Sequence, residues 1–196
     1  IVNLRDEAHI GKEVRVQGWV RTFRNDQFIA VNDGSCLGNL QLVIDREATS
    51  DALKKRLTTG AAISATGVLE ASQGQGQATE LRVAELHILG DADPESFPIQ
   101  MKRHSMEFLR EKAHLRFRTS TFGAVFRVRH ALNFAIHKFF TEEGFFQMHT
   151  PIITGSDAEG AGEMFQVTTL DVANAPKTPD GAVDYSSDFF GKMSNL

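Results

Sequence analysis

Five short runs with strand-like patterns between residues 12 and 90 constrain the fold more than any other feature of this sequence. In these runs, apolar residues alternate with polar ones, as on a strand with one buried face, or stand together, as in a fully buried strand. Turn-forming residues separate the runs, for example at 32–35 and 72–77. The runs begin at Val14, Phe28, Leu40, Ala62 and Leu81.

One helical pattern, at residues 51–57, lies between the third and the fourth run. Five strands with one helix between strands three and four is the order of an OB-fold barrel, whose strand face and loops bind single-stranded nucleic acid. Other small five-stranded barrels share this number of strands. The pattern therefore predicts an OB-fold and, with it, a nucleic-acid ligand.

A second unit is expected after the barrel. At 91–100, charged residues and prolines replace the periodic apolar residues, which is typical of a linker. A long helix should follow, ended by Gly144 as its C′ glycine. We expect a strand at 145–148 and an exposed insertion at 173–187. The helix is capped by Thr119, Ser120 or Thr121, and its apolar stripe is Phe122, Val125, Phe126, Leu132, Ile136, Phe139 and Phe140.

Charge is unevenly distributed along the chain, whose formal net charge is -4. Residues 1–98 carry 10 Lys or Arg against 14 Asp or Glu, and residues 141–196 carry 2 against 9. Between them, residues 99–140 carry 9 against 2, and we call this segment the basic island. Such asymmetry is typical of a chain that contacts a polyanion at its centre, although a solvated helix face gives the same pattern.

Composition excludes several classes of protein. A hydrophobic content of 41% over 196 residues supports a real core, so disorder is excluded. No run approaches the roughly 20 apolar residues of a membrane-spanning helix, and the amino end does not look like a secretory signal. The single cysteine, Cys36, excludes an internal disulfide and the usual zinc-ribbon spacings. We therefore expect a cytoplasmic protein with no metal site and no membrane partner.

Several segments carry a family likeness. The run EGFFQMHTP at 143–151 resembles motif 1 of the class II aminoacyl-tRNA synthetases. Together with HTPIIT at 149–154 and EGAGEMF at 159–165, it resembles the bacterial asparaginyl-tRNA synthetases in particular. The likeness extends back through KRH at 102–104 and EFLR at 107–110 to GWVR at 18–21, so it covers nearly the whole chain.

The resemblance implies an α+β protein. It implies an OB-fold anticodon-binding domain, a five-stranded β-barrel, at 1–92 and a hinge at 93–118. It further implies that 119–196 is the start of the class II antiparallel-sheet catalytic domain, truncated and containing motif 1. In this family motif 1 forms a homodimer, so Pro151 is expected at the dimer interface. The alternative for Pro151 is simple termination of a strand.

The resemblance also implies an activity for the full-length protein. In this family, the enzyme uses ATP and Mg²⁺ to convert asparagine to asparaginyl-adenylate, and then joins asparagine to tRNA(Asn). Aspartyl-tRNA synthetases share the same plan. The segments EMF at 163–165 and PKT at 176–178 favour the asparaginyl branch.

Glu159 is the candidate for amino-acid binding. In the family, the glutamate of the matching Glu-Gly-Ala turn binds the α-ammonium group of the substrate, and a carboxylate suits an ammonium through charge-assisted hydrogen bonds. The alternative is structural, because Ser156 and Glu159 have the spacing of a capping box, which needs no substrate.

Four residues of the first domain are candidates for anticodon binding. In the family, the aromatic residue at the position of Phe28 stacks on the central anticodon base, a contact worth about 1–3 kcal/mol. Gln41 lies on the next expected strand, and its amide can donate to and accept from a uracil edge. Arg21 and Arg24 follow the first strand, where guanidinium groups hold phosphates, although Phe23 stands where the family usually has a basic residue. The alternatives are a core phenylalanine and a solvent-facing glutamine.

The basic island supplies further candidate contacts, to the inner bend of a tRNA. A solvated helix face and hinge is the alternative for any single member, so only the cluster is informative. Its candidate members are Lys102, Arg103, Arg110, Lys112, Arg116, Arg118, Arg127 and Arg129.

The likeness ends at FFGK, residues 189–192, before the motifs that carry the family's ATP-binding arginines. We therefore expect no catalytic residue here, poor binding of ATP and Mg²⁺, and no aminoacylation by these 196 residues alone. The main interpretation is that the chain is part of an asparagine-tRNA ligase. Two other interpretations stay open. One is a stand-alone tRNA-binding module without catalysis, and the other is an aspartyl or nondiscriminating relative.

Overall fold

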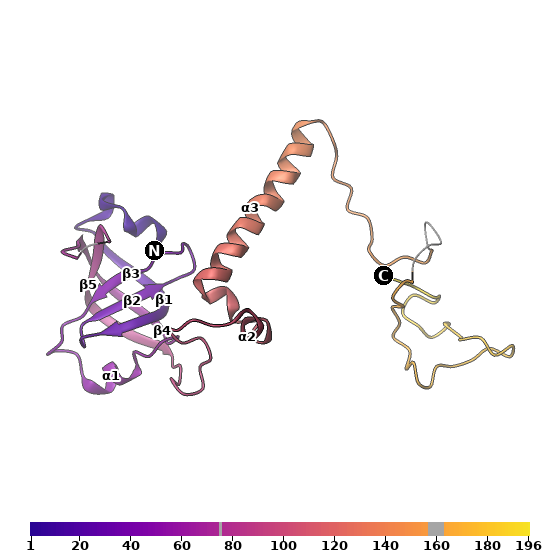
Figure 1. Cartoon of the computed structure of the whole chain (residues 1–196), viewed down its shortest axis with the longest axis horizontal. Coiled ribbons are helices and arrows are strands. Elements are labelled where there is room, and N and C mark those ends of the chain that lie inside the picture. Colours follow the sequence, from indigo (N-terminus) through magenta and orange to yellow (C-terminus); the bar gives the residue numbers. More distant parts are fainter. Residues whose placement is uncertain (75, 157–162) are drawn as a thin grey trace. The chain divides into compact units, whose positions relative to one another are not determined.

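The computed structural model describes residues 1–74, 76–156 and 163–196 (Figure 1). It divides into two compact units, Ile1–Ala135 and Ile136–Leu196. The domain limits expected at 92 and 118 stay predictions. Within the described ranges, no helix has both the length and the apolar character that crossing a membrane requires.

The first unit contains a closed five-stranded barrel (Figure 1). Around the barrel the strands follow the order β1-β2-β3-β5-β4, and all neighbouring pairs are antiparallel except β3 and β5, which are parallel. A short helix, α1 (Asp51–Arg56), connects β3 to β4. This is the element order predicted for an OB-fold. The strands are β1 (Glu13–Arg24), β2 (Phe28–Asn32), β3 (Leu40–Val43), β4 (Ala62–Ala71) and β5 (Thr79–Gly90).

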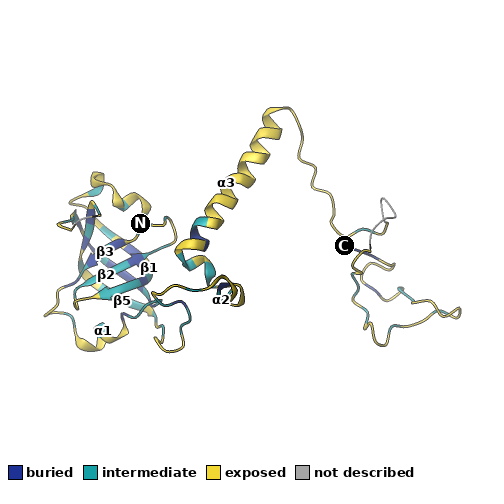
Figure 2. Ribbon diagram, viewed as in Figure 1, coloured by how far each residue is buried: buried dark blue, intermediate teal, exposed yellow. Residues whose placement is uncertain are grey.

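Side-chain alternation builds the barrel core, which lies inside the ring of strands (Figure 2). Successive side chains of a strand point to opposite faces, so one face of each strand supplies the core. In β2 and β3 the buried and half-buried residues alternate strictly. The core consists of Val16, Val20, Ile29, Val31, Leu40, Leu42, Ile44, Leu57, Ala61, Ile63, Ala65, Leu69 and Leu81.

Two short helical segments lead from the barrel to the long helix. They are α2 (Met106–Glu111) and a 3₁₀ turn (Arg116–Arg118). The long helix, α3 (Ser120–Glu142), begins where the Thr119 hydroxyl accepts a hydrogen bond from the backbone N–H of Phe122, at 3.4 Å. Gly144 follows the helix with φ of +86°, as expected of a C′ glycine. The predicted helix and its limits are thus present.

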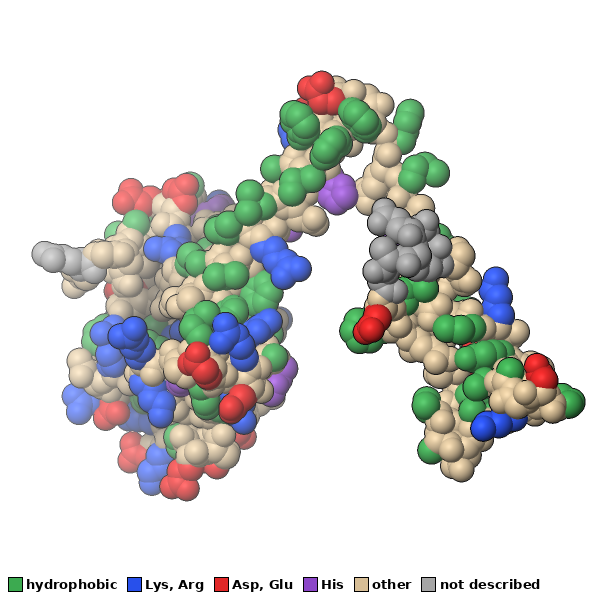
Figure 3. Space-filling view, turned by 45° about the vertical axis from the view of Figure 1, so that its right-hand side comes forward, with side chains coloured by type: hydrophobic (Ala, Val, Ile, Leu, Met, Phe, Trp, Pro, Cys, Tyr) green, Lys and Arg blue, Asp and Glu red, His purple; other side chains and the backbone are tan. Residues whose placement is uncertain are grey.

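Most of the apolar stripe of α3 is exposed, and Figure 3 shows hydrophobic side chains along this helix. Only Phe122 and Gly123 of the helix are buried. Phe122 packs with Ile99 and Leu109 in a small second core. Apolar surface of this extent on a helix marks a face that takes part in an interaction. The exposed residues are Val125, Phe126, Val128, Leu132, Phe134, Ile136, Phe139 and Phe140.

The second unit pairs backbone segments but has little regular structure. Thr154 and Asn195 exchange both backbone hydrogen bonds, at 2.9 and 2.8 Å, and Phe165 does the same with Leu196, at 3.2 and 2.8 Å. These are antiparallel pairings. The strand expected at 145–148 is wrong, because this segment has no regular structure. A strand needs a neighbouring strand, and this segment instead donates a backbone hydrogen bond from the Phe145 N–H to the Phe140 carbonyl oxygen at the end of α3, at 3.0 Å.

Asp188 organises one turn of the second unit, and a pH dependence follows from it. The backbone N–H and the hydroxyl of Thr169 both donate to Asp188 Oδ1 at 2.7 Å, and these bonds hold the pKa of Asp188 below its usual value. A lowered folded-state pKa stabilises the fold above the unfolded pKa of about 3.9, and this stabilisation is lost as pH falls through the folded pKa. We expect Asp188→Asn to flatten the acid-induced loss of amide-exchange protection at Thr169. An unchanged profile would contradict this role.

Candidate nucleic-acid interface

Phe28 and Gln41 lie on the same outer face of the barrel. The residues that flank them along β2 and β3 are buried in the core, so the two-residue period turns both candidates outward. In the antiparallel ladder, Phe28 is opposite Val43 and Ala30 is opposite Gln41. The two candidates are therefore diagonal neighbours on adjacent strands, close enough for one RNA base to reach both.

The strand β1 brings one of the two candidate arginines to this face. Arg24 is opposite Phe28 in the β1–β2 ladder. Arg21 falls at the register shift between residues 20 and 22, and its Nη1 donates to the carbonyl oxygen of Arg118 at 2.7 Å. Burial lowers the pKa of Arg21. Phe23 packs against the core, so the structure explains the absence of a basic side chain there.

Glu80 of β5 joins the same face, although the sequence patterns did not single it out. Gln41 is paired with Glu80 in the parallel β3–β5 ladder, and its Nε2 donates to Glu80 Oε2 at 3.1 Å. The Ser72 hydroxyl donates to the same oxygen at 3.0 Å. These bonds orient the Gln41 amide and leave its carbonyl oxygen to accept a hydrogen bond from a base. The position of Glu80 directly before the apolar run that begins at Leu81 was the available signal.

Members of the basic island divide into stacked and exposed side chains. The guanidinium of Arg116 lies 4.8 Å from the ring centre of Phe122, and that of Arg118 lies 4.2 Å from the ring centre of Trp19. These are cation–π distances, so both arginines contribute to packing as well as to charge. The exposed members are Lys102, Arg103, Arg110, Arg127 and Arg129.

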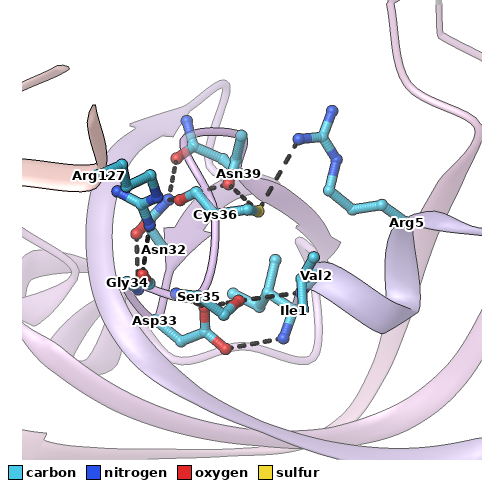
Figure 4. Close-up of polar contacts among 11 residues, drawn as sticks. Ile1, Val2, Arg5, Asn32, Asp33, Gly34, Ser35, Cys36, Asn39 and Arg127 are labelled. Atoms are coloured by element: carbon cyan, nitrogen blue, oxygen red, sulfur yellow. Dashed lines mark hydrogen bonds and ion pairs between the residues drawn. The ribbon is translucent and has the colours of Figure 1, made fainter. Parts of the chain in front are cut away.

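Side-chain hydrogen bonds hold the loop between β2 and β3 (Figure 4). Asn32 Nδ2 donates to the carbonyl oxygens of Cys36, at 3.1 Å, and Gly38, at 2.9 Å. Arg127 Nη2, from α3, donates to the carbonyl oxygen of Gly34 at 2.5 Å. This end of the barrel is therefore joined to the beginning of α3.

Two family models match the chain in agreement with this geometry. Residues 14–89 match the OB-fold nucleic acid binding domain, and residues 105–191 match the tRNA synthetases class II (D, K and N). Over residues 105–191, the chain is similar to this synthetase family. The first match runs from β1 to β5, so the candidate face lies inside a nucleic-acid-binding domain. The predicted OB-fold followed by the start of a class II synthetase domain is confirmed.

Curated proteins similar to this chain are asparagine-tRNA ligases. The chain is 53% identical over 199 aligned positions to the ligase of Parabacteroides distasonis, covering 100% of this chain and 42% of the relative. It is 56% identical over 185 positions to the ligase of a Nostoc species, covering 92% and 40%. The chain thus spans about two fifths of the length of these relatives. The resemblance to asparaginyl-tRNA synthetases is confirmed.

Solved structures share the fold of this chain. The asparaginyl-tRNA synthetase of Pyrococcus horikoshii complexed with asparaginyl-adenylate superposes with a TM-score of 0.72 at 22% identity, over 96% of this chain and 40% of that one. The Entamoeba histolytica asparaginyl-tRNA synthetase gives 0.72 at 20% identity, over 98% and 41%. At these identities the likeness shows the fold alone.

The candidate residues of the class II segment are placed only in part. Glu159 lies outside the described residues, and so does its capping-box pairing with Ser156. Pro151 is exposed. It lines a shallow hollow together with His149, Thr150, Ile152, Ile153 and Phe190. The amino-acid-binding and dimer-interface roles therefore stay predictions.

Clusters of metal-ligating side chains are absent from the described residues. Magnesium takes oxygen ligands, usually one or two carboxylates together with substrate phosphates. Within the described ranges, no three His, Cys, Asp or Glu side chains are grouped so that they could hold a metal ion. We derive no chemical step through Mg²⁺ or ATP from these residues.

Proposed function

We propose that the outer face of β2, β3 and β5 binds the anticodon bases of a tRNA. The observation that carries this proposal is that Phe28, Gln41 and Glu80 lie on three neighbouring strands of an OB-fold nucleic-acid-binding domain. The face combines a stacking surface, an amide and a carboxylate, and Arg24 adds a positive charge beside the aromatic ring. These groups suit unstacked, single-stranded bases.

Each residue has a distinct role in this proposal. Phe28 stacks on one base, which gives affinity for any base. The Gln41 carbonyl oxygen accepts from the N–H of a uracil edge, because its amide nitrogen already donates to Glu80. The carboxylate of Glu80 accepts from base amino or imino groups and excludes edges that present only acceptors. Arg24 pairs with the phosphate backbone of the RNA. Arg21 can do so only if its hydrogen bond to the carbonyl oxygen of Arg118 breaks.

We further propose that the complete protein is a cytoplasmic asparagine-tRNA ligase. It joins asparagine to tRNA(Asn) with ATP and Mg²⁺, and Glu159 holds the α-ammonium of asparagine. The support is the identity of 53–56% to curated ligases. A homodimer through motif 1, with Pro151 at the interface, is supported by the exposed apolar residues of α3. The proposed limits are 1–92 for the anticodon domain, 93–118 for the hinge and 119–196 for the catalytic segment.

Substitution of Phe28 by alanine tests the proposed RNA-binding face. We expect Phe28→Ala to weaken the binding of an anticodon stem-loop by about 1–3 kcal/mol, roughly 5- to 150-fold in Kd, because one stacked base loses its partner. Fluorescence anisotropy of a labelled tRNA(Asn) stem-loop measures the change. Unfolding by urea, followed in parallel, reports whether the variant is folded.

Val68→Ala is the matched control. Val68 is an exposed apolar residue of the barrel, whereas Phe28 is half-buried, and Val68 lies on β4, outside the proposed face. This variant should bind the stem-loop within about twofold of the unchanged chain. If folded Phe28→Ala binds as tightly as Val68→Ala, the proposed face does not bind the anticodon.

A further inference from the structure

A second candidate site lies in the first unit, at the opposite end of β1 and β2 from Phe28. A cavity of about 480 Å³ opens between the loop that follows β2 and the beginning of α3. Trp19 and Asn32, which are paired in the β1–β2 ladder, line it from the barrel. Its volume lies within the range of small-molecule sites, roughly 300–1,000 Å³.

The cavity is lined by positive charge without compensating negative charge. Arg21, Arg118 and Arg127 line it, His130 lies at its edge, and none of its lining residues is acidic. Among the residues that the structure describes, none of these three guanidinium groups forms an ion pair with a carboxylate. Arg127 donates to the backbone carbonyl oxygens of Gly123 and Gly34, and Figure 4 shows the bond to Gly34. Arg21 donates to the backbone carbonyl oxygen of Arg118 and to Met101 Sδ.

Two of these arginines also repel each other. Burial lowers the pKa of Arg118, and the charge of Arg21 lowers it further. The Nε of Arg118 is buried and has no hydrogen-bond partner among the described residues. Placing like charges together in a partly desolvated site is unfavourable unless an anion compensates them. The cavity therefore has the electrostatics of an anion site.

The remaining walls are apolar, which distinguishes this cavity from a site for a bare anion. Leu37, Phe117 and Phe126 line it, and all three are substantially exposed in the described structure. Asn39 adds an amide that can pair with a polar edge. A flat apolar body carrying a negative group would cover the aromatic surface and neutralise the guanidinium groups together.

We propose that this cavity binds a nucleotide, with its phosphate on the guanidinium groups of Arg118 and Arg127 and its base against Phe117 and Phe126. The proposal does not depend on the anticodon face, because the two sites use different residues. The same chemistry is presented by a free mononucleotide and by a nucleotide of a bound RNA.

Titration of the 196-residue chain with AMP tests this proposal. Equilibrium dialysis measures the binding, and the fluorescence of Trp19, the single tryptophan of the sequence, reports binding in the cavity. We expect saturable binding with a concurrent fluorescence change, and weaker binding of adenosine and of inorganic phosphate. Binding of phosphate as tight as that of AMP would overturn the proposed base contact. The absence of AMP binding up to about 1 mM would overturn the site.

Two matched pairs of variants locate the ligand. Arg127→Met should raise the Kd for AMP at least about fivefold, whereas Arg129→Met removes the same charge from the same helix outside the cavity and should change it less than about twofold. Phe126→Ala and Phe134→Ala form the equivalent aromatic pair, since only Phe126 lines the cavity. If the two variants of either pair changed the Kd for AMP equally, the proposed position of AMP in the cavity would be wrong.

Competition identifies the source of the nucleotide. If the anticodon stem-loop or a whole tRNA displaces AMP, the cavity takes a nucleotide of the RNA; if neither does, it takes a free nucleotide. Both outcomes support the site. The AMP titration is read from Trp19 in the cavity, whereas the anticodon proposal is read from stem-loop binding by Phe28→Ala, so a failure of one proposal is distinguishable from a failure of the other.

Discussion

Leu42→Ala is expected to lower the free energy of unfolding of the barrel by about 2–5 kcal/mol. Leu42 is fully buried in β3, where it is paired with Ile29 on one side and with Leu81 on the other, and both partners are also fully buried. Replacing the isobutyl side chain by a methyl group leaves a cavity that the strands of a closed barrel cannot collapse to fill. Urea unfolding, followed by circular dichroism, measures the loss.

The control for Leu42→Ala is again Val68→Ala, which removes apolar atoms from an exposed position and should cost less than about 1 kcal/mol. Leu42 is adjacent to Gln41 on β3, so the destabilised barrel should also bind the anticodon stem-loop less well once part of it is unfolded. A loss for Leu42→Ala as small as that for Val68→Ala would show that β3 is not central to the core.

The barrel could be predicted from the sequence because the residues that define each strand are close neighbours along the chain. Alternation around Leu40 and Leu42 gives both the strand and the face that it buries, and the turn residues separate β2 from β3. The same alternation placed Gln41 opposite to Leu40 and Leu42. Phe28 begins an apolar run, so the sequence left a core position open for it, and the structure places it outside the core. The order of one helix between the third and the fourth strand then selected the OB-fold among small barrels.

Other features depend on contacts between distant segments, so the sequence alone does not provide them. Glu80 reaches Gln41 through the parallel pairing of β3 with β5, which has no local signature. Arg21 lies at a register shift of β1 and turns to the Arg118 carbonyl 97 residues away. The strand expected at 145–148 failed for the same reason, since a strand is defined by its partner.

Gly67→Ala is expected to destabilise the barrel by about 3 kcal/mol or more. Gly67 lies at a register shift between β4 and β5, and a Cβ placed on it would be 2.0 Å from the carbonyl oxygen of Arg82 and 2.9 Å from the Cα of Val83. Both are backbone atoms, so no side-chain rotation relieves the clash. Gly90→Ala is the matched control in the same strand pair, because its Cβ would meet only the Cβ of Ala62, at 3.8 Å.

The same clash links the barrel framework to RNA binding. To accommodate a methyl group at Gly67, the chain of β5 at Arg82 must move, and Arg82 is paired with Val43 on β3. Glu80 lies two residues earlier on β5 and holds the Gln41 amide. Gly67→Ala should therefore weaken binding of the anticodon stem-loop under conditions where the protein is still folded, whereas Gly90→Ala should not. Equal unfolding midpoints and equal stem-loop affinities for the two variants would contradict this coupling of β4 to the RNA-binding face.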